Sequence, residues 1–191
     1  ALDALHKDLK SLKLSDFKES DNFLSLKKSI TLKNINFNYP NSSRTALKNI
    51  HFSINAKTSF GIIGATGSGK TTVVDIILGL LEAQQGILEV DGKEINKFNS
   101  KDWQRSIGYV PQHIFLSDDS VAANIAFGIQ NENIDYKAVE RAAKIARLHE
   151  FVTDELPQKY QTTIGERGVR LSGGQRQRIG IARALYNNPK V

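Results

Sequence analysis

Residues 64–71 read Gly-Ala-Thr-Gly-Ser-Gly-Lys-Thr, which satisfies the pattern G-x-x-x-x-G-K-[ST] at every fixed position. The short apolar run 60–63 predicts a strand before this stretch, and the apolar spacing over 73–81 predicts a helix after it. A glycine loop between a strand and a helix is the context that a phosphate-binding loop requires. We therefore expect an α/β core built around this loop.

The residue types of this loop suit the binding of a nucleoside triphosphate. Glycine lets the backbone curve closely enough for its N–H groups to point at phosphate oxygens, and the start of the helix adds positive potential. We expect the Lys70 ammonium to reach the β- and γ-phosphates and the Thr71 hydroxyl to bind Mg²⁺. The predicted nucleotide contacts of the loop are Gly64, Ala65, Thr66, Gly67, Ser68, Gly69, Lys70, Thr71 and Thr72.

A second glycine motif, Leu171-Ser172-Gly173-Gly174-Gln175, stands at the head of a helix predicted over 172–186. Ser172 is a suitable N-cap, and the two glycines leave backbone N–H groups open. This motif predicts a second anion site. One domain rarely needs two such sites for one nucleotide.

The LSGGQ motif, followed by Arg176-Gln177-Arg178 and IGIARAL, resembles the signature of ATP-binding cassette (ABC) ATPases, and the resemblance covers residues 30–191. It implies an α/β fold with a P-loop NTPase (RecA-like) core, an N-terminal antiparallel β subdomain and an inserted helical subdomain at roughly 113–170. Two such domains pair head to tail around two MgATP. Ser172, Gly173, Gly174 and Gln175 then close over the γ-phosphate that the partner's loop holds.

The same resemblance assigns roles to residues outside the two glycine motifs. Tyr39 matches the aromatic residue that stacks on adenine, and Gln112 matches the glutamine that senses Mg²⁺ and the γ-phosphate. Gln112 is therefore expected beside Lys70 in catalysis and beside Thr71 at the metal. The run 163–168 resembles the coupling loop of exporters, in which Glu166 reaches the transmembrane domain.

Three functional elements of the family are not found in these 191 residues: the Mg²⁺-binding Asp, the catalytic Glu and the switch His. Lys190-Val191 would begin the strand that carries the first two. The run 151–155 contains Asp-Glu but precedes the signature in a helical stretch, so we reject it. We expect these residues alone to bind ATP weakly, to hydrolyse it poorly and to expose apolar surface.

Composition narrows the function classes. Cysteine is absent, which excludes disulfides and cysteine metal sites, and no apolar run of membrane-spanning length occurs. The net charge of +6 resides in 158–191. A nucleic-acid binder can show such a cluster, but no aromatic residues alternate with these arginines, so we favour a local cluster. The four histidines lack metal-ligand spacing.

The remaining segments complete the predicted organisation. Residues 1–28 look like a tether from an upstream membrane domain, and 29–191 form the ATPase domain. Alternating apolar residues predict strands over 30–39 and 47–54, and a hairpin is predicted at 87–92. A buried strand is predicted over 107–110, with helices over 120–127 and 136–148.

The resemblance implies the ATPase motor of an exporter that forms a homodimer on the cytoplasmic face of a bacterial plasma (inner) membrane, with ATP and Mg²⁺ as cofactors. Its transmembrane partner would contact the Gln112 and Glu166 regions. The run 115–128 resembles exporters of lipids and lipid-linked glycans at least as well as drug exporters. The alternatives are a non-hydrolysing regulatory subunit, an importer ATPase, and a soluble ABC ATPase on nucleic acid, for which sustained heptads between Thr71 and Ser172 are missing.

Overall fold

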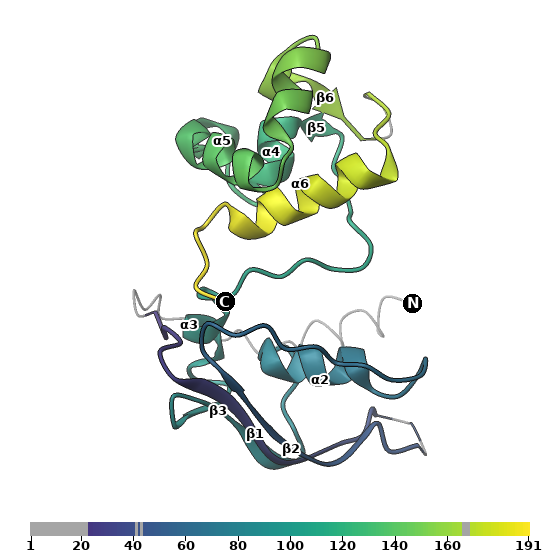
Figure 1. Ribbon diagram of the computed structural model, residues 1–191, viewed down its shortest axis with the longest axis vertical. Helices are drawn as coiled ribbons and strands as arrows, with labels where there is room; N and C mark the ends of the chain where they lie inside the picture. The colour runs from purple at the N-terminus through teal and green to yellow at the C-terminus, as the bar shows by residue number, and fades with distance from the viewer. Residues whose placement is uncertain (1–22, 41, 43, 166–168) are drawn as a thin grey trace, which may run out of the picture.

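The computed structural model describes residues 23–40, 42, 44–165 and 169–191 and shows two lobes, one above the other (Figure 1). We call residues 23–107 the β lobe and residues 117–187 the helical lobe. Each lobe has its own cluster of buried apolar side chains. The described part of the chain contains no helix that is both long and apolar enough to cross a membrane.

The β lobe is built on an antiparallel sheet with the strand order β2-β1-β3-β4. The alternating residues of β1 place one face of the sheet in the core, and a register shift after Leu32 lets Ile35 and Phe37 keep that face. The sheet strands are β1 (Ser29–Phe37), β2 (Leu47–Asn55), β3 (Gln85–Val90) and β4 (Lys93–Ile95).

Two helices cover the buried face of this sheet. Helix α2 (Lys70–Ile77) buries Val73 and Ile76 against β1 and β3. Gly79 follows the C-cap Leu78, and its left-handed φ of 68° lets the Leu80 amide donate to the Asp75 carbonyl at 2.9 Å. Helix α3 (Ser100–Gln104) carries the fully buried Trp103.

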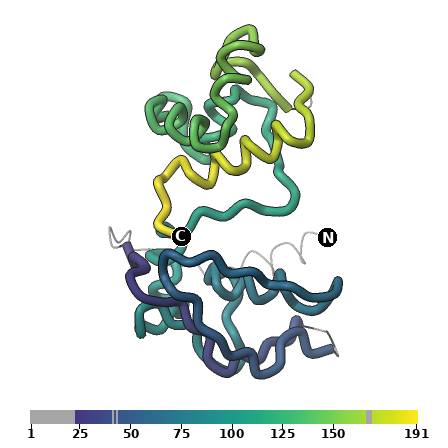
Figure 2. The backbone as a smooth tube through the Cα atoms, in the orientation of Figure 1, coloured from purple at the N-terminus to yellow at the C-terminus, as the bar shows by residue number. Residues whose placement is uncertain are grey.

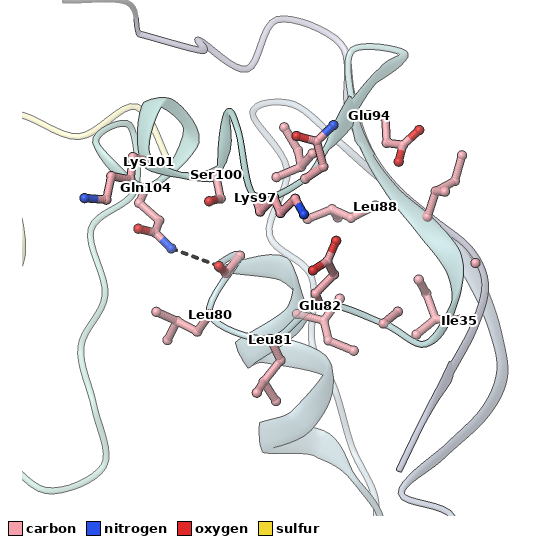
Figure 3. Close-up of a pocket in the computed structure, with 17 residues that line it drawn as sticks. Ile35, Leu80, Leu81, Glu82, Leu88, Glu94, Lys97, Ser100, Lys101 and Gln104 are labelled. Carbon is pink, nitrogen blue, oxygen red and sulfur yellow. Dashed lines mark hydrogen bonds between the residues drawn. The ribbon is translucent and has the colours of Figure 1, made fainter. Parts of the chain in front are cut away.

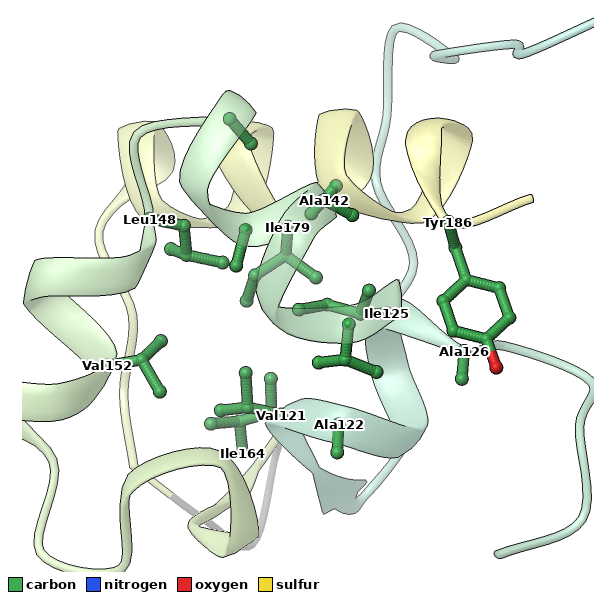
Figure 4. Packing of buried hydrophobic residues seen from close by; sticks show 14 of the residues in the cluster. Val121, Ala122, Ile125, Ala126, Ala142, Leu148, Val152, Ile164, Ile179 and Tyr186 are labelled. Carbon is green, nitrogen blue, oxygen red and sulfur yellow. The ribbon is translucent and has the colours of Figure 1, made fainter. Parts of the chain in front are cut away.

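The helical lobe packs short helices around the long helix α6 (Figure 4). Val121, Ile125 and Ala142 face Ile179 of α6 across an interior of small and branched side chains. Its elements are β5 (Asp119–Ser120), α4 (Val121–Ile125), η1 (Asn131–Asn133), α5 (Tyr136–Ile145), the π-turn η2 (Phe151–Glu155), η3 (Lys159–Gln161), β6 (Thr163–Ile164) and α6 (Gly173–Leu185).

Two chain segments join the lobes, one after α3 and one after α6 (Figure 2). Their ends meet, because Ser106 O accepts from the Lys190 amide at 2.8 Å and the Gly108 amide donates to Val191 O at 2.8 Å. The Val191 amide also reaches Ser106 O, at 3.1 Å. Val191 thus donates to Ser106 and accepts from Gly108, which is the hydrogen-bond pattern of two parallel strands.

Most predicted elements are confirmed, with shifted ends, but two predicted strands are wrong. Neither 60–63 nor 107–110 forms a strand in the described part of the chain. A strand needs a hydrogen-bonded neighbour along its length, and only the start of 107–110 has one, at Val191. Apolar side chains of these runs remain exposed, Ile63 at 95% and Tyr109 at 44%.

Candidate nucleotide-binding site

At two positions the phosphate loop has a left-handed backbone conformation, which glycine adopts without steric strain. Gly67 and Gly69 have φ values of 76° and 88°. A Cβ on Gly69 would lie 2.7 Å from the Ala46 carbonyl oxygen and 2.8 Å from a methyl of Leu47. The turn into α2 therefore depends on close contact with the start of β2.

Lys70 directs its ammonium back across the loop. Its Nζ donates to the carbonyl oxygens of Gly64 at 2.9 Å and Ala65 at 2.8 Å. Thr71 beside it is exposed, whereas Thr72 is buried. The cationic head of Lys70 and the hydroxyl of Thr71 therefore lie within one turn of helix.

Tyr39 lies beside this loop. Its hydroxyl is 3.1 Å from Thr72 Oγ1, and its ring packs edge-on against Phe37 with centroids 5.0 Å apart. A cavity of about 290 Å³ opens between Tyr39 and the loop. These contacts hold the ring at the rim while leaving it 42% exposed, so a face remains for a flat ligand.

Three residues of this cavity were not predicted from the sequence: Ser42, Arg44 and Ala46. Arg44 and Lys70 both line this cavity, so Arg44 adds a second positive charge to it, which suits the binding of a polyphosphate. Its signal was weak, because a single arginine in a turn after Tyr39 reads as an ordinary solvated residue. The glycines, Lys70 and Arg44 together fit a nucleotide phosphate chain.

The signature motif caps helix α6 with a full capping box. Ser172 Oγ accepts from the Gln175 amide at 3.2 Å, and Gln175 Oε1 accepts from the Ser172 amide at 2.8 Å. A Cβ added to Gly173 or Gly174 would meet no atom of the described residues within 4 Å. Later in α6, a Cβ on Gly180 would instead collide with Ile114.

The remaining predicted residues lie apart from this cavity. Gln112 is exposed in the segment that joins the lobes, and neither it nor 172–175 lines the cavity beside Tyr39. The phosphate loop, residues 64–71, thus lies in the β lobe, and the signature motif, residues 171–175, lies at the helical lobe (Figure 1). Glu166 lies outside the described residues.

A second cavity, of about 420 Å³, lies between the end of α2, the β3–β4 hairpin and α3 (Figure 3). Gln104 Nε2 donates to the Gly79 carbonyl there at 2.9 Å, and Glu82, Glu94 and Lys97 point into it. It contains none of the predicted site residues. Within the described ranges, no group of three or more His, Asp or Glu side chains could hold a metal ion.

Residues 47–191 match the family model described as ABC transporter. The chain belongs to the ABC transporter family. The match contains both glycine motifs and the helical lobe between them. It begins at β2, so Tyr39 lies outside the matched range.

Individual ABC proteins show the same relationship. The chain is 43% identical over 162 residues to an ATP-dependent lipid A-core flippase of Saccharophagus degradans, covering 85% of this chain and 27% of the flippase. It is 41% identical over 162 residues to the uncharacterized ABC transporter ATP-binding protein YfiB of Bacillus subtilis, covering 85% and 28%. The chain thus spans under a third of these relatives.

A solved structure supports the same family fold. The structure of a bacterial Atm1-family ABC exporter with ATP bound superposes with a TM-score of 0.83 at 30% identity. The superposition covers 98% of this chain and 32% of that exporter chain. The two lobes of this chain are therefore arranged as in the nucleotide-binding part of that exporter structure.

Proposed function

We propose that this chain is part of the ATP-binding and ATP-hydrolysing motor domain of a bacterial ABC exporter, on the cytoplasmic face of the inner membrane, and that the full-length protein carries out the hydrolysis. In this proposal it pairs head to tail with a second copy around two MgATP, and a transmembrane domain contacts the Gln112 and Glu166 regions. The lipid A-core flippase relatives favour a lipid or lipid-linked glycan as cargo.

The observation that carries the proposal is the open space around Gly173 and Gly174. A glycine at a helix start normally costs stability relative to alanine unless its φ or its surroundings exclude a side chain. Here neither excludes one within the described part of this chain. The two glycines are therefore explained by a ligand that approaches from outside, for which the partner's γ-phosphate is suited.

The chain's own residues then have separate tasks. Tyr39 offers its ring to the adenine, the loop amides and Lys70 bind the phosphates, and Arg44 adds charge. Thr71 and Gln112 would hold Mg²⁺, which neutralises charge on the phosphate oxygens when bound. Ser172 and the two glycines of the partner would donate to the γ-phosphate and shield its charge from bulk solvent.

The test uses the full-length protein from the intact gene with Gly174→Ala. We expect unchanged or slightly higher stability, because alanine favours helix and finds free space. We also expect ATP-dependent dimerisation to be lost and ATPase activity to fall about 100-fold, since a methyl group keeps the γ-phosphate from the α6 amides. Analytical ultracentrifugation and phosphate release measure both.

Gln177→Ala is the matched control, because Gln177 is exposed on the same helix. Lys70→Ala gives the baseline without phosphate binding. Full activity in Gly174→Ala would contradict the proposal that the signature closes on nucleotide. ATP-dependent dimerisation without hydrolysis in the unmodified protein would instead favour a non-hydrolysing regulatory subunit.

A further inference from the structure

Asp91 has a role that its place in a hairpin turn does not require. It stands between β3 and β4 with φ 54°, followed by Gly92 with φ 82°. Two successive left-handed residues form a type I′ turn, which asparagine fits as well as aspartate. The turn alone therefore gives no reason for a carboxylate at this position.

The Asp91 carboxylate instead accepts three consecutive backbone amides from a distant segment. Its Oδ2 accepts from Lys27 at 2.7 Å, and its Oδ1 accepts from Lys28 at 2.7 Å and Ser29 at 2.9 Å. Hydrogen bonds to a charged acceptor are stronger than neutral ones. In return, the Asp91 amide donates to Ser29 O at 2.8 Å.

We define residues 24–29 as the entry strap, because through them the preceding chain enters β1. Two further bonds hold the strap, from the Leu24 amide to Asp102 O at 3.3 Å and from the Ala56 amide to Lys28 O at 2.7 Å. Leu24 and Leu26 also pack against the buried core of the β lobe. The strap is thus fixed to three parts of the lobe.

The charge state of Asp91 agrees with this geometry. Desolvation is the largest single effect and raises its pKa, but the Ser29, Lys28 and Lys27 amides and the charge of Lys28 lower it by more together. The net pKa lies below the ordinary value, so Asp91 is ionised at neutral pH. Its charge is therefore available to the strap.

We propose that Asp91 is a positioning residue whose carboxylate locks the entry strap to the β lobe, so that residues 24–28 join the domain without a hinge. Only the consequence for transport rests on the proposed function: movement of the motor passes directly to the segment before it. The anchor itself follows from the contacts of Asp91 alone.

The first experiment is limited trypsin digestion of the full-length protein, with the sites identified by mass spectrometry. Lys27 and Lys28 are exposed, but a peptide bond must leave its hydrogen bonds to enter a protease. In Asp91→Asn we expect cleavage after these two lysines to be about tenfold faster, because the open strap is more populated. Glu132→Gln, an exposed charge removal in the helical lobe, should match the unmodified protein.

The second experiment asks whether the effect is confined to the strap. Since this chain has no cysteine, Ser25→Cys and Lys48→Cys accept two spin labels. We expect Asp91→Asn to broaden the distance distribution between the labels and to leave ATPase kcat and the KM for ATP within about twofold, because the phosphate loop contacts are unchanged.

Unchanged cleavage and an unchanged distance distribution in Asp91→Asn would overturn the proposal. A loss of ATPase activity in this variant would overturn it too, because Asp91 would then act on the nucleotide site. A complete absence of ATPase activity in the unmodified protein would contradict the proposed function, while the proteolysis and the distances would still decide on the anchor.

Discussion

Tyr160 and His149 form a partly buried pair in the helical lobe. The Tyr160 hydroxyl lies 2.8 Å from His149 Nδ1, and the two ring centroids are 6.0 Å apart. Desolvation, and after it the negative charge of Glu140, raises the pKa of Tyr160 to about 12. The folded protein therefore favours the protonated phenol more than the unfolded chain does.

This pair predicts an alkaline stability change. A raised pKa means that the stabilisation is complete below the unfolded value near 10 and is lost as pH rises toward 12. We expect Tyr160→Phe to lower the free energy of unfolding by about 1 kcal/mol at neutral pH. The difference from the unmodified protein should shrink above pH 10, as measured by urea unfolding at several pH values.

Tyr136→Phe is the control, since the Tyr136 hydroxyl accepts from Gln161 at an exposed site. A difference for Tyr160→Phe that stays constant between pH 8 and 12 would show that the pKa of Tyr160 is not raised. Absorbance at 295 nm reports the same ionisation directly.

At the residue scale, the sequence predicted residues that belong to a contiguous motif. It missed residues that only folding brings close to the site. Lys70 and Ser172 were predicted from motifs that specify each neighbour. Arg44 reaches the cavity only because β1 and β2 pair and carry their connecting turn to the phosphate loop. Asp91 was expected only as a turn residue, because its partners lie more than 60 positions earlier in the chain.

Among the elements, helix α6 depends on its N-cap residue, Ser172. Ser172→Ala removes one half of the capping box, and we expect a loss of about 1 kcal/mol in the free energy of unfolding. Because the signature glycines form the first turn of α6, we also expect faster hydrogen exchange at the start of α6 than at its centre. Exchange followed by mass spectrometry measures both regions.

Ser172→Thr is the matched control for this helix start. Threonine keeps an acceptor oxygen at the N-cap, so most of the stability should return. Equal exchange in Ser172→Ala and the unmodified protein would mean that the capping box adds nothing to α6.

Elements with local causes were predicted well. The alternation of β1 and the Asp91-Gly92 turn sit in the sequence itself, and both were found in the structure. The strands predicted over 60–63 and 107–110 were wrong because a buried parallel strand depends on its neighbours. An apolar run shows that a segment seeks burial, but it does not show which segment pairs with it.

For the whole molecule, the two separate cores suggest that the lobes can lose structure independently. Arg183 on α6 fastens the segment after Gln112 to the helical lobe, because it donates to Asn124 O at 2.8 Å and to Phe115 O at 2.9 Å. Its guanidinium also lies 4.5 Å from the Phe127 ring centroid. Burial lowers the pKa of Arg183, so this charge is partly desolvated.

We expect Arg183→Gln to destabilise the helical lobe by about 2 kcal/mol, since its charged hydrogen bonds to Asn124 and Phe115 are lost. Hydrogen exchange should rise over 115–127 and over α6 and should stay constant over β1 to β3. Arg178→Gln is the control, because Arg178 is exposed and donates to Arg147 O at 3.0 Å outside the core of the lobe. A rise that includes the sheet would show that the lobes unfold together.

The two chain segments that lead into and out of the helical lobe meet at one place, where Ser106 O accepts from the Lys190 amide. The free-energy cost of closing a loop grows only with the logarithm of its length, so a longer or shorter insert adds little once its ends are held together. We therefore expect the β lobe to accept a transplanted helical lobe at this junction. We also expect a short linker from Ser106 to Lys190 to replace the helical lobe altogether. This makes the junction a grafting point for chimaeric motors, in which the signature of one protein is combined with the phosphate loop of another.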